Sequence, residues 1–321
     1  MNDNSQVIIA LCSYYGRDDT VPYSPSEWSK LAVVLRERNI EPKELSEFSS
    51  SQFYDLGFDL EQTKRTLRLL DRMGSIPFEL EKYRSMGIQI TTRAEKDYPR
   101  MIKKRMGKKC PPLFYYAGNP ELMAKDTVGF VGSRKTEKRD ELFTRNIVGK
   151  VVTRSYGVVS GGAKGIDYFA MKSALSNDSF CINYVSDSIV RLLRNNEYAS
   201  AVLDGKIILI SAENPEQEFT TATAMARNRY IYAQSEATVV VRCEYGKGGT
   251  WNGAADNLKN KFCPLFCWDR DDLKGNVELI KMGAYPIDED WNADVSHNNK
   301  NTDDNEIQII SPQQLSLFDM I

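Results

Sequence analysis

Two glycine-containing segments, each directly after an apolar run, constrain the fold of this chain most strongly. They are VGSR at 131–134 and SGGAKGID at 160–167, and each leads into a helical pattern. Glycine at a strand-to-helix turn lets backbone N–H groups approach an oxyanion, and the helix N-terminus adds unpaired N–H groups. Arg134 and Lys164 place positive charge inside these turns. We therefore expect an edge that binds the phosphate of a nucleotide, a sugar phosphate or a nucleic acid.

Strand-like and helical patterns alternate between residues 127 and 268. The apolar runs lie at 128–131, 158–159, 181–185, 207–210, 238–241 and 265–268. Continuous apolar strands separated by helices predict an α/β fold of the Rossmann-like, doubly wound kind, with a mainly parallel sheet covered on both faces. Ligands of such sheets bind beyond the carboxyl ends of the strands, which is where both glycine turns are expected.

The patterns divide the chain into three segments. Residues 1–86 are predicted to form a small N-terminal helical domain, in which Ser24, Pro25 and Glu27 give an N-cap, a first-turn proline and a capping box. Residues 87–287 form the predicted Rossmann-like domain. Residues 288–321 begin rich in Asp, Asn and Glu and end apolar, which predicts a disordered linker carrying a partner-binding peptide.

Composition excludes several classes of protein. The formal net charge of −2 rules out a basic coat, so a polyanion site must be local. The six cysteines form no CxxC pair and we find no signal peptide, so we expect a cytoplasmic protein. The single histidine, His297, lies in the polar tail, so we expect no metal site, no His-based triad and no cofactor. No apolar run reaches membrane-spanning length, so we expect no membrane partner.

Two further groups are expected at the same sheet edge. The first is Arg227, Asn228 and Arg229 in a helical setting, where the planar guanidinium groups of arginine suit phosphate oxygens. The second is GKGGT at 246–250, where Thr250 is a candidate N-cap for the next helix. The complete predicted DNA or phosphate site is Gly132, Ser133, Arg134, Gly161, Gly162, Lys164, Gly165, Arg227, Asn228, Arg229, Gly248, Gly249 and Thr250. The alternative is that the glycines only make tight turns and the arginines only form surface ion pairs.

Basic and aromatic residues near these turns have two interpretations each. Eight Lys or Arg residues lie between residues 93 and 109, where they form either a solvated helix face or part of a polyanion site. The aromatic residues near the turns either stack on the bases of single-stranded nucleic acid or pack in the core; they are Tyr168, Phe169, Tyr230, Tyr232 and Trp251.

These motifs together resemble the DprA/Smf family of DNA-processing proteins. The matching residues are VGSR, SGGAKGID, SAL at 173–175, ARNRYI at 226–231 and GGT at 248–250, with ITTRAEKDYPRMIKK and CPPLFYYAGN upstream. The resemblance covers residues 86–270. It implies that the chain binds single-stranded DNA and has a RecA-type recombinase as a partner. A homodimer is a further partnership that we consider. It departs from the family at Ala170-Met171, where Ala-His is common, and no winged-helix domain follows residue 287. The pathway, whether transformation, repair, a mobile element or defence, therefore stays open.

A second function class remains open. The GGT turn also resembles phosphoribohydrolases of the same superfamily, but these place a Glu a few residues on, and TWNGAAD at 250–256 has none. Asp167 is the only acid in a glycine turn and is expected at a helix N-terminus. We therefore predict no catalytic residues and no enzyme activity. The alternative is a nucleotide-binding sensor or nucleotide-processing enzyme, for example in phage defence.

The C-terminal residues contain a second resemblance. Gln314, Leu315, Ser316, Leu317 and Phe318 match the pentapeptide by which bacterial proteins dock on the DNA polymerase sliding clamp. A chance match is the alternative for so short a motif. Its place after a polar linker predicts that Gln314, Leu315, Leu317 and Phe318 bind the sliding clamp.

Overall fold

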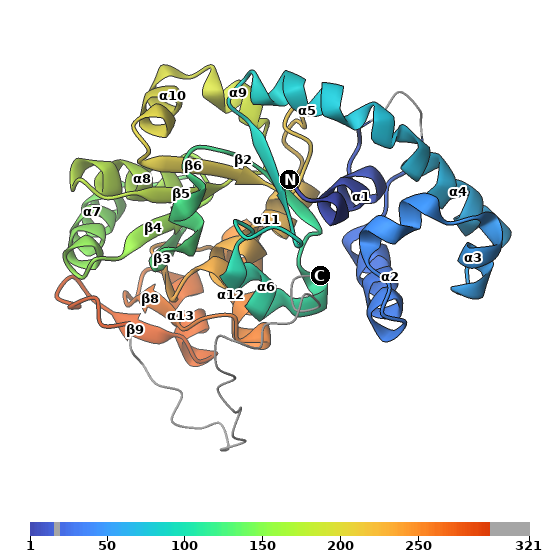
Figure 1. The fold of residues 1–321 in the computed structure, drawn as a ribbon. Coiled ribbons are helices and arrows are strands. Elements are labelled where there is room, and N and C mark those ends of the chain that lie inside the picture. The colour runs from blue at the N-terminus through green and yellow to red at the C-terminus, as the bar shows by residue number, and fades with distance from the viewer. Residues whose placement is uncertain (16–19, 296–321) are drawn as a thin grey trace.

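A nine-stranded sheet with the order β1-β2-β6-β5-β4-β3-β7-β8-β9 forms the centre of the computed structural model, which describes residues 1–15 and 20–295 (Figure 1). β1 (Gln89–Thr92) and β2 (Leu113–Ala117) are antiparallel to each other, and β2 is antiparallel to β6. The other neighbours are parallel, and these strands are β3 (Thr127–Val131), β4 (Gly157–Ser160), β5 (Cys181–Tyr184), β6 (Ile207–Ser211), β7 (Ala237–Val240), β8 (Leu265–Trp268) and β9 (Tyr285–Ile287). The predicted doubly wound, mainly parallel sheet is confirmed.

Helices cover both faces of this sheet. Along β6, Ile207 and Leu209 join the core on one face, and Ile208 and Ile210 join the core on the other. The first face carries α7 (Lys138–Thr153), α8 (Ile166–Ser176), α9 (Ile189–Leu193) and α10 (Asn196–Leu203). The second carries α6 (Arg100–Met106), α11 (Thr221–Gln234), α12 (Gly248–Asn260) and α13 (Lys274–Lys281). Two apolar faces explain why the strands read as continuous apolar runs.

The described residues before β1 form only helices and connecting segments, which lie beside the β1–β2 edge (Figure 1). They are α1 (Asp3–Cys12), α2 (Pro25–Glu37), α3 (Ser50–Asp55), α4 (Leu60–Asp71), α5 (Ile76–Arg84) and the 3-10 turns Pro42–Glu47 and Arg72–Gly74. Trp28, fully buried, lies in their separate core. The predicted capping box at Ser24 and Glu27 is present. α1 joins the two parts, because Ile8 packs in the helical core and Ile9 in the sheet core.

The structure adds three strands to the six predicted runs: β1, β2 and β9. It also shows that the chain stays packed beyond residue 288, where a disordered linker was expected. The Trp291 ring lies 4.8 Å from the Phe266 ring, and Lys150 donates a hydrogen bond to the Glu289 carbonyl. Residues 296–321, which include the predicted clamp-binding peptide, lie outside the described residues. Among the described helices, none is long and apolar enough to cross a membrane.

Candidate nucleic-acid interface

The chain adds strands to one side of β3 in the order β4, β5, β6, and then to the other side in the order β7, β8, β9, so the direction of winding reverses between β3 and β7. From β3 the chain passes to α7 on one face, and from β7 it passes to α12 on the other face. The two connections therefore diverge at the carboxyl ends of these strands and open a crevice, which is where doubly wound sheets bind their ligands. The turn after β4 lies beside it, because β4 pairs with β3. We call the surface formed by residues 132–134, 161–165 and 248–250 the glycine edge.

The two predicted glycine turns pack directly against each other. Gly165 has φ +81°, and a Cβ there would come within 2.9 Å of the Arg134 Cα. A Cβ at Gly132 would overlap the side chain of Ile166. The Ile166 N–H donates to the Ser133 carbonyl at 3.4 Å. Gly165 is needed because the backbone of the first turn passes against it, and Gly132 because the Ile166 side chain fills the space beside it. Both contacts bring the two predicted segments into one site.

Arg134 and Lys164 extend from the glycine edge into solvent. Both residues are exposed, and neither forms an ion pair with any residue in the described ranges. The Arg134 guanidinium lies 4.9 Å from the centre of the Phe219 ring, a cation–π contact that sequence reasoning missed. Two adjoining cavities, of about 600 and 660 Å³, share Arg134 and Arg227 in their walls. The edge thus combines free positive charge with an aromatic ring beside open space.

A buried ion pair lies beneath the second glycine turn. The Asp167 carboxylate lies 3.6 Å from Nη1 of Arg227, and the backbone N–H groups of Gly161 and Ala163 favour its charged form. Burial raises the pKa of Asp167 and lowers the pKa of Arg227, against their mutual attraction. A side chain at Gly161 would overlap the Arg227 guanidinium. The sequence predicts that Arg227 contacts phosphate, but this residue is only 5% exposed and is paired inside the protein.

The remaining predicted residues hold the walls of the crevice together. Arg229 Nε donates to Asp256 at 2.8 Å, and Asn228 Nδ2 donates to the Gly249 carbonyl at 3.0 Å. Thr250 Oγ1 donates to the Gly132 carbonyl at 3.1 Å. The expectation that Thr250 is an N-cap is wrong, because α12 begins at Gly248. Its hydroxyl instead connects α12 to the turn after β3.

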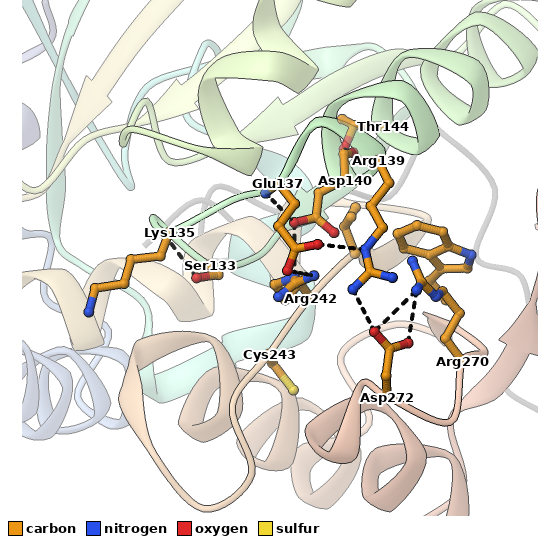
Figure 2. Close-up of polar contacts among 12 residues, drawn as sticks. Ser133, Lys135, Glu137, Arg139, Asp140, Thr144, Arg242, Cys243, Arg270 and Asp272 are labelled. Atoms are coloured by element: carbon orange, nitrogen blue, oxygen red, sulfur yellow. Dashed lines mark hydrogen bonds and ion pairs between the residues drawn. The ribbon is translucent and has the colours of Figure 1, made fainter.

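A network of six charged residues, which sequence reasoning did not find, anchors the loop after β3 (Figure 2). Arg242, which follows β7, lies 2.9 Å from both Glu137 and the fully buried Asp140. Arg139 and Arg270 both pair with Asp272. Apart from Arg270 and Asp272, the residues of these pairs lie far apart in the chain, so no local pattern signals them. Lys135 extends away from the network (Figure 2). The network fixes the loop that carries Arg134.

The aromatic residues divide into two groups. Tyr230 and Tyr232 are buried in the core, so for them packing is the correct interpretation. Tyr168, Phe169 and Trp251 are only partly buried, and Trp251 packs edge-on against Tyr245 at 5.0 Å. Across residues 1–15 and 20–295, no group of three His, Cys, Asp or Glu side chains could hold a metal ion.

The family described as DNA recombination-mediator protein A matches residues 89–295, nearly two thirds of the chain. The chain belongs to this family. The resemblance to DprA and Smf proteins that the motifs predicted is therefore confirmed. Protein Smf of Synechocystis is 27% identical over 223 residues, which cover 66% of this chain and 54% of that protein. DNA processing protein DprA of Streptococcus pneumoniae is 26% identical over 139 residues, covering 43% and 49%. The chain spans about half the length of these curated relatives.

Solved structures show the same fold. The crystal structure of DprA from Streptococcus pneumoniae superposes with a TM-score of 0.68 at 17% identity, covering 89% of this chain and 95% of that chain. A DprA structure from Helicobacter pylori, reported for its single-stranded DNA binding mode, gives a TM-score of 0.52 at 22% identity. It covers 63% of this chain and 92% of that chain. The chain therefore has the fold of DprA proteins.

Proposed function

We propose that this DprA-family chain binds single-stranded DNA along the glycine edge and acts as a recombination mediator in DNA processing. One observation carries the proposal: Arg134 and Lys164, both exposed and without an ion pair in the described ranges, stand on paired glycine turns at the switch point of the sheet. The single-stranded DNA binding reported for the Helicobacter pylori relative supports the same ligand.

The arrangement favours a strand over a single nucleotide. Ligand pockets usually measure about 300–1,000 Å³, and here two cavities of that size adjoin at Arg134. The Phe219 ring lies in the wall of both, where a base could stack. In addition, the backbone N–H groups of Gly161 and Ala163 interact with the Asp167 carboxylate beneath the turn, so they are less available to a terminal phosphate. Phosphates would instead meet the two cationic side chains.

The test is a salt titration of DNA affinity. Arg134→Ala combined with Lys164→Ala should weaken binding of single-stranded DNA and reduce the slope of log affinity against log salt by about 1.4, because two phosphate contacts no longer release counterions. The control is Lys259→Ala with Lys274→Ala, which removes the same charge from exposed lysines that do not line the crevice. Unchanged affinity and slope in the folded double variant would refute the proposal. Tight nucleotide binding without DNA binding would favour the nucleotide sensor instead.

We further propose that the site binds without catalysis. Asp167, the acid inside the glycine turn, is 6% exposed and paired with Arg227, so it is not placed to act as a general base on a ligand. Incubation of the pure protein with nucleoside monophosphates should release no free base. Sustained release that is lost on Asp167→Ala would contradict this.

Protein partners are proposals from the sequence. A RecA-type recombinase fits the mediator role, a second copy of the chain would make a homodimer, and the C-terminal peptide fits the sliding clamp. Burial of one large apolar side chain is worth roughly 1.5–3 kcal/mol, so Leu317→Ala with Phe318→Ala should lower clamp affinity at least about tenfold. Equal clamp affinity for the full chain and for a chain ending at Pro312 would show that the motif match is accidental.

A further inference from the structure

A second groove, of about 710 Å³, lies where the N-terminal helical part meets the sheet domain. Three segments form it: the first turns of α2, the end of α6 with the 3-10 turn Gly107–Lys109, and the middle of α11. α2 packs against this 3-10 turn, and α6 packs against α11. We call it the α2–α11 groove, and the lining residues that matter below are Ser26, Ser29, Lys30, Lys108, Lys109 and Arg229.

The charge of this groove has one sign. Four of its lining residues are cations, Lys30, Lys108, Lys109 and Arg229, and none of the described residues that line it is an acid. Arg229 is paired with Asp256. The three lysines are exposed, and in the described ranges none of them forms an ion pair or hydrogen bond through its side chain. Like charges gathered without counter-charge repel one another, so an anion that enters the groove is stabilised by all three.

The groove and the glycine edge share α11. Met225 lines the crevice at the glycine edge, whereas Arg229, one turn further along the same exposed side of the helix, lines the α2–α11 groove. A chain of phosphates that leaves the crevice across α11 therefore enters a second cationic surface. Lys108 and Lys109 also end the basic run at 93–109, for which the sequence left a solvated face and a polyanion site as alternatives.

We propose that the α2–α11 groove holds the backbone of the same DNA strand beyond the glycine edge, with Lys30, Lys108 and Lys109 each neutralising a phosphate. This inference rests on the proposed function, since it names where the bound strand continues. Ser26 and Ser29 line the groove beside Lys30 and offer neutral hydrogen-bond donors. The groove thus makes the N-terminal helical part a contributor to DNA binding, and affinity should depend on strand length.

The experiment compares two lengths of single-stranded DNA on the full chain. An oligonucleotide of about six nucleotides fills the glycine edge, and one of about twenty also reaches the groove. In Lys30→Ala/Lys108→Ala/Lys109→Ala, the salt slope for the longer DNA should fall by about 2, three contacts at about 0.7 each. A fourfold rise in salt should then weaken the wild type about twentyfold more than the variant. Binding of the shorter DNA should be unchanged.

The matched control is Lys125→Ala/Lys259→Ala/Lys274→Ala, which removes the same charge from exposed lysines outside both surfaces. Two results refute DNA binding in the groove. One is a salt slope for the longer DNA that is equal in the groove variant and the wild type. The other is a slope that falls as much in the control as in the groove variant. The proposed function still stands in that case if Arg134→Ala/Lys164→Ala weakens binding of both lengths. Failure of the wild type to bind either length overturns the proposed function and the groove together.

Discussion

Removal of the Asp167 charge tests whether the ion pair beneath the glycine turn stabilises the fold. Asp167→Asn keeps the size of the side chain, but it leaves the Arg227 guanidinium buried without a counter-charge. At the observed 3.6 Å, the attraction amounts to about 5 kcal/mol at an effective dielectric of about 20. Loss of one partner of a buried pair typically costs about 3–5 kcal/mol. We expect a loss of that size in the free energy of unfolding.

Arg227→Met should cost less, because the remaining carboxyl can take up a proton. Burial already raises the pKa of Asp167 above its ordinary value of 3.8, and loss of the arginine raises it further. The stability contribution of such a group is present below the ordinary value and is lost as pH rises through the raised native pKa. The Arg227→Met variant should therefore be close to the wild type at low pH and fall further below it as pH rises.

Urea unfolding of both single variants and the double variant measures the coupling between the two residues. The double variant should be about as stable as Arg227→Met alone, since no charge is then left without a partner. A loss below about 1 kcal/mol for Asp167→Asn, or strictly additive losses in the double variant, would refute the reasoning. DNA affinity measured on the same variants shows whether the pair also shapes the glycine edge.

Three other predictions concern single positions. Gly165→Ala should destabilise the fold by at least about 1–3 kcal/mol in thermal unfolding, because φ is +81° and the loop after β3 leaves no room for a Cβ; an unchanged melting temperature would contradict this. The Arg65 guanidinium lowers the pKa of Glu27 to about 2. The ionised Glu27 carboxylate therefore stabilises the fold above pH 4.5, and this contribution is lost as pH falls toward 2. Arg65→Met should remove most of that acid dependence, as measured by denaturant midpoints across this range. Arg242→Met removes the ion-pair partner of the fully buried Asp140 carboxylate, so it should destabilise the fold in urea unfolding by more than the roughly 0–1 kcal/mol of a surface ion pair. A loss within that range would show that the network is dispensable.

The sheet could be predicted because its strands carry their own signal. β4 and β5 are apolar on both faces and lie between helical patterns, so each run identifies itself without knowledge of its neighbours. β9 escaped prediction because Pro286 sits inside it and two of its three residues are exposed, as is usual at a sheet edge. β2 is fully buried, but it is antiparallel and lies apart from the alternating strand–helix units that defined the pattern.

The site could be predicted only in part. Glycine turns are local features, so the sequence identified Gly132 and Gly165. The two turns contact each other because the strands before them, β3 and β4, are parallel neighbours. The role of Arg227 was not accessible, because its partner Asp167 lies sixty positions earlier and nothing in either segment marks the pair. Arg242 and Asp140 pose the same difficulty. Long-range charge pairing leaves no periodicity in a sequence, whereas burial and turns do.

Because the Asp167 carboxylate and its partner Arg227 pack directly beneath Gly161, the second glycine turn is held in place before any ligand binds. A loop that is fixed by its own carboxylate loses little conformational entropy when DNA binds, and ordering costs are among the main penalties of association. Phosphates are the same in every nucleotide, so a preorganised edge that contacts phosphates has the same binding free energy for every base sequence. For the DNA binding proposed above, the buried pair therefore lowers the entropic cost of binding without favouring any one base sequence.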